Sequence, residues 1–131
     1  MPSIEINGGN VVYEILGDSG DLIAMTPGGR FSKDIEGLRP LAEALVAGGY
    51  RVLLWDRPNC GASDVQFYGQ SESHMRAETL HKLVTGLGFD RCILAGGRFW
   101  MRWRRDWNCR RMRWQRRAKC YRASATCRRR R

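Results

Sequence analysis

The sequence predicts an α/β fold, with a short N-terminal hairpin followed by parallel strands and crossover helices. Three observations lead to this prediction. The first 97 residues contain three continuous apolar runs, two stretches of helically spaced apolar residues separate them, and glycine or proline follows most of these elements. Continuous apolar runs are typical of strands buried on both faces, which occur in parallel sheets covered by helices. An Arg-rich tail, irregular or helical, comes after this sheet.

The hairpin is the first predicted element. Residues 3–6 and 11–16 are β-prone, and residues 7–10 between them read Asn-Gly-Gly-Asn, which favours a turn. Another turn at residues 17–21 leads into the apolar run 22–26. The string Gly-Asp-Ser-Gly in that turn resembles a protease motif, but no partner residue accompanies it, so it is interpreted as a turn.

Helices and strands then alternate. Apolar residues recur at helical spacing from Ile35 to Val46, and a Gly-Gly pair stops this helix. Residues 50–55 form the second buried strand. Either Ser71 or Ser73 caps a second helix that runs to about Leu87. Residues 92–95 form the third buried strand, which is followed by two glycines.

Three loops are expected to form the functional edge of this sheet. Parallel sheets bind their ligands at the carboxyl ends of the strands. The loops at that edge begin at Pro27, Asp56 and Gly96.

Two of these loops carry recognisable motifs. Residues 26–30 read Thr-Pro-Gly-Gly-Arg, and residues 56–64 read Asp-Arg-Pro-Asn-Cys-Gly-Ala-Ser-Asp. The second resembles the D-x-R-G-x-G-x-S-D loop of the α/β-hydrolase family, with Pro58 and Asn59 as departures. The first resembles that family's H-G-x-P loop, with Pro27 in place of His. Residues 1–97 are therefore similar to the N-terminal half of an α/β-hydrolase.

The resemblance implies an activity and a set of site residues. The implied reaction is hydrolysis of an ester, amide or carbon–carbon bond in a small-molecule substrate by a serine nucleophile, with no cofactor. Backbone N–H groups around Gly28, Gly29 and Arg30 would hold the oxyanion. The family loop motif is carried by Asp56, Arg57, Gly61 and Ser63.

The nucleophile is missing from its expected position. In this family the third strand runs into a G-x-S-x-G turn that presents the serine. Here the chain reads Gly96-Gly97-Arg98, and arginine stays protonated and has no lone pair to donate. Nothing beyond this point supplies the family's acid and histidine. The chain is therefore expected to have no catalytic residue of its own and to be inactive.

The tail differs sharply from the rest in composition. Residues 98–131 hold 15 Lys and Arg against one Asp, whereas residues 1–97 hold 8 Lys and Arg against 12 Asp and Glu. The formal net charge of +10 therefore comes from the tail alone. The tail also lacks Val, Ile, Leu and Gly. Residues 1–97 are expected to be the hydrolase part, and residues 98–131 an extension outside the family fold.

A frameshift explains this composition. Arg, Trp and Cys become frequent when GC-rich coding DNA is read out of frame. The codons of residues 98–100, CGN-TTY-TGG, read GNT-TYT-GGA one base later, a pattern that includes Gly-Ser-Gly. The leading hypothesis is a frameshift just after Gly97, in the gene or in its determined sequence, which truncates the family domain at the nucleophile.

An alternative interpretation gives the tail a binding function. Arginines interleaved with tryptophans bind nucleic acid, and as an amphipathic helix they lie on anionic membranes. The chain would then be a non-catalytic binding protein with a basic tail. No apolar run approaches the roughly 20 residues of a transmembrane helix. Five cysteines without metal-ligand spacing indicate no metal site and a reduced, cytoplasmic setting.

The remaining polar candidates have simpler interpretations. Ser63 lies in a structural loop, and His74 and His81 are expected on a helix surface. Cys60 is either a reactive thiol near the site or a spectator. Arg30 either meets an anionic substrate group or is solvated. The third strand is expected to leave an unpaired apolar edge, because its outer neighbour would come from the missing half.

Overall fold

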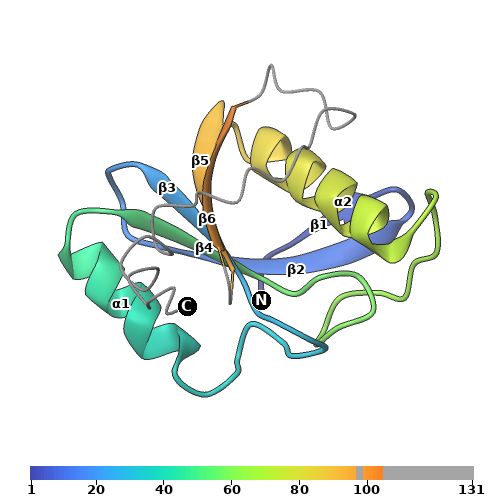
Figure 1. Ribbon diagram of the computed structural model, residues 1–131, viewed down its shortest axis with the longest axis horizontal. Coiled ribbons are helices and arrows are strands. Elements are labelled where there is room, and N and C mark those ends of the chain that lie inside the picture. The colour runs from blue at the N-terminus through green and yellow to red at the C-terminus, as the bar shows by residue number, and fades with distance from the viewer. Residues whose placement is uncertain (97–98, 105–131) are drawn as a thin grey trace, which may run out of the picture.

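The structure of this protein is a computed structural model that describes residues 1–96 and the backbone of residues 99–104. Its elements are β1 Ser3–Ile6, β2 Gly9–Leu16, β3 Leu22–Thr26, α1 Leu38–Ala47, β4 Arg51–Trp55, α2 Glu72–Gly86, β5 Arg91–Gly96 and β6 Phe99–Arg104. The strands form one mixed sheet in the order β1-β2-β4-β3-β5-β6. Helices α1 and α2 lie on opposite faces of this sheet (Figure 1). The predicted α/β fold is confirmed.

The central strands are parallel, as the apolar runs predicted. Strand β3 pairs in parallel with β4 on one side and with β5 on the other. The N-terminal strands pair antiparallel, β1 with β2 and β2 with β4. The β1–β2 turn is tighter than expected, because Ile6 pairs with Gly9. Asn7 and Gly8 form this two-residue turn with φ of 53° and 80°, the combination that suits the twist of a hairpin.

Successive residues of the buried strands face opposite sides of the sheet, so two separate cores form. In β3, for example, Leu22 and Ala24 belong to one core, and Ile23 and Met25 belong to the other. The α2 side also contains Leu53, Trp55, Leu83, Val84, Cys92 and Leu94. The α1 side contains Ala42, Val52, Leu54 and Ala95. This arrangement explains why the strands are apolar throughout instead of alternating.

The helix boundaries refine the sequence prediction. Helix α1 begins at Leu38, later than the apolar spacing from Ile35 indicated, because Gly37 before it adopts a left-handed φ of 84°. Of the two serines proposed as a cap for α2, Ser71 is the one used, and its side chain accepts a hydrogen bond from the His74 amide at 3.2 Å. Neither α1 nor α2, the helices of the described residues, is long and apolar enough to cross a membrane.

The prediction that β5 has an unpaired outer edge is wrong. Strand β6 lies antiparallel to β5 along its whole length, from Gly96 opposite Phe99 to Arg91 opposite Arg104. Two physical reasons explain the difference. An antiparallel partner needs only a short connection, whereas a parallel one needs a crossover. The segment 99–104 is also rich in aromatic residues, which favour strands. The first tail residues therefore extend the sheet.

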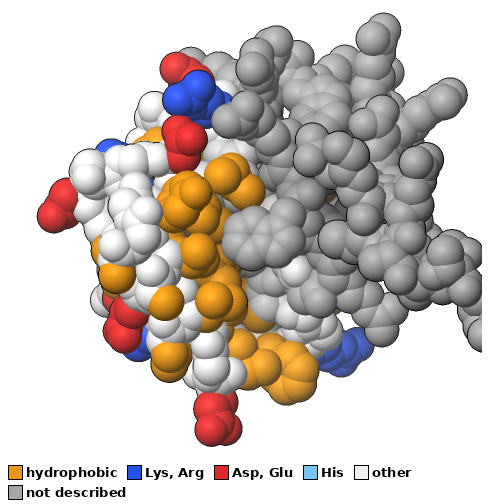
Figure 2. All heavy atoms as spheres, turned by 60° about the vertical axis from the view of Figure 1, so that its left-hand side comes forward, with side chains coloured by type: hydrophobic (Ala, Val, Ile, Leu, Met, Phe, Trp, Pro, Cys, Tyr) orange, Lys and Arg blue, Asp and Glu red, His pale blue; other side chains and the backbone are white. Residues whose placement is uncertain are grey.

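Hydrophobic side chains gather in a band on the face that carries α1 (Figure 2). One helix has a diameter of roughly 10 Å, whereas six strands at about 4.8 Å spacing are more than twice as wide. A single helix of the described chain therefore does not span a face of the sheet. Among residues 1–96, the exposed large hydrophobic residues are Met1, Phe31, Leu41, Tyr50, Val65 and Phe67.

Candidate active site

The sheet brings the ends of three strands together. Thr26 at the end of β3 pairs with Gly96 at the end of β5, and Met25 pairs with Leu54 of β4. The Trp55 indole N–H donates to Thr26 Oγ1 at 3.0 Å, which ties β4 to β3 at the same edge. The three loops named from the sequence therefore start from adjacent strands, as expected of parallel strands.

The carboxylate of Asp56 organises the loop after β4. It is 1% exposed and accepts hydrogen bonds from the Lys33 N–H at 2.6 Å and the Ala62 N–H at 3.0 Å. Gly61 packs against it so closely that a Cβ there would lie 2.3 Å from Asp56 Oδ2. Ser63 donates to the Asp56 carbonyl at 2.7 Å and accepts from the Val12 N–H at 2.9 Å. Asp56, Gly61 and Ser63 thus form a structural unit.

Asn59 explains one departure from the family motif. It has a left-handed φ of 66°, a conformation that asparagine tolerates better than most residues and that glycine adopts freely. Its side-chain amide donates to the Gln66 carbonyl at 2.9 Å and accepts from the Gln66 N–H at 2.8 Å. Asparagine therefore replaces the usual glycine without losing the turn, and it ties the loop to the segment that leads into α2.

Arg57 reaches across to the glycine loop after β3. Its guanidinium donates to the Gly29 carbonyl at 2.6 Å and lies near the Gly28 and Phe31 carbonyls at 3.4 and 3.5 Å. Burial, followed by repulsion from Arg76, lowers the pKa of the Arg57 guanidinium from its ordinary value. An arginine nevertheless stays charged at neutral pH. A buried cation therefore holds the carbonyl groups of this loop in place.

This contact also determines where the loop's N–H groups point. In a trans peptide, the N–H lies opposite the carbonyl of the preceding residue, and the described residues contain no cis peptide. Since the Gly28 and Gly29 carbonyls face Arg57, the N–H groups of Gly29 and Arg30 face away from it. The Phe31 N–H is used differently, donating to the Gly28 carbonyl at 3.3 Å. Gly29 has a φ of 57°, which a side chain would strain.

The other polar candidates are placed away from a catalytic arrangement. His74 is exposed on α2, with its Nδ1 3.9 Å from Glu78 Oε2. Cys60 is a buried free thiol. Position 98, where the sequence lacks the serine, lies outside the described residues. The nucleic-acid or membrane surface suggested for residues 98–131 also lies outside them, apart from the backbone of residues 99–104. The described residues hold no group of three potential metal ligands.

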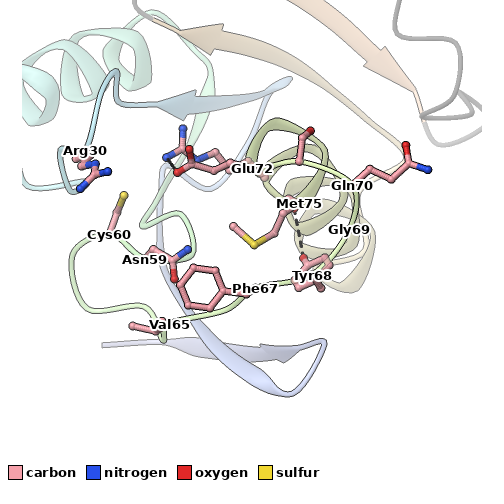
Figure 3. A pocket seen from close by; sticks show the side chains of 12 residues that line it. Arg30, Asn59, Cys60, Val65, Phe67, Tyr68, Gly69, Gln70, Glu72 and Met75 are labelled. Atoms are coloured by element: carbon pink, nitrogen blue, oxygen red, sulfur yellow. Dashed lines mark hydrogen bonds and ion pairs between the residues drawn. The ribbon is translucent and has the colours of Figure 1, made fainter.

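A cavity of about 630 Å³ opens beside the glycine loop. Arg30 lines it on one side, together with Asn59 and Cys60 of the β4 loop, and Met75 of α2 projects into it (Figure 3). Its volume is within the range of small-molecule sites. Sequence reasoning placed Met75 on the apolar side of a helix and did not identify this cavity, because no periodic pattern links residues 30, 60 and 75.

Comparison with known proteins supports the resemblance. No protein-family model matches the sequence. A protein of Klebsiella pneumoniae subsp. pneumoniae, named 2-hydroxy-6-oxononadienedioate/2-hydroxy-6-oxononatrienedioate hydrolase, is 42% identical over 66 residues, which are 50% of this chain and 20% of that protein. The chain thus spans about a fifth of this relative.

Solved structures show the same fold. MGS-M2, an α/β-hydrolase enzyme from a Medee basin deep-sea metagenome library, has a TM-score of 0.62 at 19% identity, over 72% of this chain and 34% of its own. A hydrolase from Pseudomonas aeruginosa PA01 has a TM-score of 0.64 at 22% identity, over 72% and 35% of the two chains. The described part of this chain is therefore an α/β-hydrolase-like fragment that spans about a third of these structures.

Proposed function

We propose that residues 1–97 are the oxyanion side of a hydrolase that cleaves an ester, amide or carbon–carbon bond in a small molecule. One observation carries this proposal: Arg57 holds the Gly28 and Gly29 carbonyls, so that two adjacent N–H groups face away from it beside the end of β5. Such fixed donors suit the negative charge that develops on a carbonyl oxygen under attack. The Klebsiella relative, whose name denotes the hydrolysis of a small organic acid, is consistent with this reaction class.

The proposed mechanism divides the work between two loops. A serine after β5, activated by a histidine, attacks the substrate carbonyl, and the N–H groups of Gly29 and Arg30 receive the oxyanion. Removing a single oxyanion donor of this kind typically costs about 10²–10³-fold in rate. Asp56 contributes by holding the Lys33 N–H, which fixes the far end of the glycine loop.

We propose further that this chain does not hydrolyse substrate, because Arg98 occupies the position of the nucleophile. The oxyanion donors alone leave only weak catalysis. A frameshift after Gly97 that truncates the domain, with residues 98–131 outside the family fold, is the proposed origin of the change. The free thiols of Cys60 and Cys92 fit the reduced, cytoplasmic setting that we propose for the protein.

Hydrolysis of a nitrophenyl ester tests the proposal in two arms. The purified chain and its Arg98→Ala variant are both expected to show background turnover. A chain carrying the shifted reading frame after Gly97 is expected to gain activity, and Arg57→Lys in that chain is expected to lower kcat, because lysine lacks the guanidinium fork. Turnover by the original chain that survives Arg98→Ala would show that a nucleophile lies elsewhere. Full activity of the Arg57→Lys variant would show that the Arg57 guanidinium is not needed to hold the oxyanion loop.

A further inference from the structure

The two cysteines of the described residues are equally buried but lie in different surroundings. Cys60 and Cys92 are 5% and 3% exposed, and both are free thiols. Cys92 belongs to the α2-side core and borders a hollow of about 10 Å³, which is no larger than one water molecule. Cys60 instead lines the cavity of about 630 Å³ beside the glycine loop (Figure 3). A small solute in that cavity can therefore reach the Cys60 sulfur while the chain stays folded.

A buried cation lies next to the Cys60 sulfur. Arg57 is 4% exposed and is not one of the residues that line the cavity. The Cys60 N–H donates to the Arg57 carbonyl at 3.0 Å, so one tight turn joins the two residues. Burial and the neighbouring Arg76 lower the pKa of the Arg57 guanidinium, and a negatively charged Cys60 sulfur opposes that shift. The guanidinium and the sulfur are thus close enough to interact.

The Arg57 guanidinium has one buried N–H that lacks an acceptor. Its Nη2 donates to the Gly29 carbonyl at 2.6 Å, whereas its Nε has no hydrogen-bond partner among the described residues. A buried donor without a partner costs the free energy of its lost hydration. The thiol of Cys60 is only a weak acceptor. An oxygen atom bound to that sulfur would be a much stronger one, and a negatively charged oxygen would make a charge-assisted hydrogen bond.

The nearby carboxylates already have other partners. Glu72 is the one acidic residue among the described residues that line the cavity, and it is paired with Arg76. The Asp56 carboxylate accepts from the N–H groups of Lys33 and Ala62. The Cys60 sulfur is therefore the group best placed to bring an acceptor to Arg57.

We propose that Cys60 is a site of oxidation by hydrogen peroxide, and that Arg57 Nε holds the oxygen that the reaction adds. The thiol first loses its proton to water. The thiolate sulfur then attacks one peroxide oxygen, the S–O bond forms as the O–O bond breaks, and the departing hydroxide takes up a proton to become water. The sulfur is oxidised by two electrons and the peroxide is reduced. The product is a sulfenic acid at Cys60.

This modification acts on the arginine that holds the glycine loop. Because Arg57 Nη2 keeps its bond to the Gly29 carbonyl, a second bond at Nε fixes the guanidinium at two points. The inference stands apart from the proposed hydrolysis, since it requires neither a serine nucleophile nor the shifted reading frame.

Trapping with dimedone, which reacts with sulfenic acids, tests the proposal on the full chain. Cys109, Cys120 and Cys127 of the tail are replaced by serine, so that none of them forms a disulfide with the oxidised sulfur. The chain is treated with hydrogen peroxide and dimedone, and labelled peptides are quantified by mass spectrometry. Cys92 is the internal control, because it is as buried as Cys60 but lies in the apolar core.

We expect native Cys60 to be labelled at least about tenfold faster than Cys92, and the two rates to become similar in guanidinium chloride. Arg57→Gln removes the cation and the unpaired donor, and should slow the labelling of Cys60 about fivefold or more. Arg39→Gln is the matched control, because Arg39 is an exposed arginine of α1 paired with Glu14, and it should leave the rate unchanged.

The proposal is overturned if native Cys60 is labelled no faster than Cys92. Equal slowing by Arg57→Gln and Arg39→Gln would also overturn it, because the effect would then come from the overall charge of the chain. If Arg57→Gln does not fold, Arg57→Lys takes its place, since lysine keeps a charge but lacks the Nε donor and the planar fork. A loss of about threefold is expected for that variant, and an unchanged rate would refute the role of Arg57.

Discussion

Asp56 and Arg57 are adjacent in the sequence but hold different parts of the site. The Asp56 carboxylate accepts N–H groups from Lys33 and Ala62, whereas the Arg57 guanidinium donates to carbonyls of the glycine loop. Both side chains are buried, at 1% and 4% exposure. Buried charges are stable only when hydrogen bonds compensate their lost hydration. Through these two side chains, the conformation of the glycine loop and that of the β4 loop depend on each other.

Gly61→Ala tests the Asp56 contact. The new Cβ would lie 2.3 Å from Asp56 Oδ2 at a position with φ of +56°. The carboxylate must move and weaken two charged hydrogen bonds, so the free energy of unfolding should fall by about 3 kcal/mol or more. Gly88→Ala is the matched control, with a similar φ of +85° and no atom within 4 Å. It should cost only about 1 kcal/mol, from backbone strain alone.

Denaturant unfolding of the two variants measures this difference. Equal losses for Gly61→Ala and Gly88→Ala would mean that the Asp56 carboxylate does not pack against residue 61. The arrangement of the β4 loop described above would then be incorrect.

Cys92 gives a prediction about pH. Burial raises the pKa of the Cys92 thiol from its ordinary value of 9.0 to about 12. At pH 9 the folded chain should therefore keep Cys92 protonated, with about one thiolate in a thousand, whereas the unfolded chain holds about half as thiolate. Because the folded pKa is the higher one, this thiol's contribution to stability is present below pH 9 and is lost as the pH rises towards 12.

Alkylation by iodoacetamide at pH 9 measures that protection. The peptide containing Cys92 should react at least about a hundredfold more slowly in the native chain than in guanidinium chloride. Comparable rates in both conditions would place Cys92 at the surface, contrary to its position in the α2-side core.

At the scale of elements, the local sequence pattern was sufficient to predict those strands and helix ends that depend on neighbouring residues alone. The apolar runs of β3, β4 and β5 and the serine cap of α2 are read directly from residue types, and their positions agree with the structure within two residues. The start of α1 was not readable in this way. Its position depends on the left-handed Gly37 and on the Lys33 amide bonded to Asp56, which is 23 residues away.

Strand β6 shows the limit of composition as a guide. Residues 99–104 lack Val, Ile and Leu, and their aromatic residues were interpreted as part of an Arg/Trp-rich tail, so a strand was not predicted there. Pairing with β5 depends instead on an edge that is open for hydrogen bonding, and that edge exists only after the sheet has formed. The interaction is therefore tertiary in origin.

Truncation after residue 97 tests the role of β6. Removing β6 leaves the N–H and C=O groups along β5 without a neighbour, and we expect this chain to aggregate. A chain that ends after residue 104 keeps the strand and is the matched control. Size-exclusion chromatography with light scattering distinguishes them. A monomeric chain of residues 1–97 would show that β6 does not protect the edge.

At the scale of the whole molecule, the sequence predicted which strand ends meet but not what holds them. Gly28, Gly29 and Arg30 were proposed from a motif, and the structure adds the contacts of Arg57 with the Gly28 and Gly29 carbonyls, which orient the N–H groups of Gly29 and Arg30. The cavity was not predicted, because Arg30, Cys60 and Met75 come together only through the packing of two loops on a helix. Separate, distant segments leave no common spacing to detect.

We propose that residues 1–97 come from a serine hydrolase whose reading frame is lost at the nucleophile. The most direct test is to sequence the coding DNA and translate both other frames after codon 97. We predict that one frame continues with a serine flanked by glycines and then with alternating helices and strands rich in Val, Ile and Leu, carrying an acid and a late histidine. If neither frame yields such a sequence, the tail belongs to the protein as encoded, and the claim is contradicted.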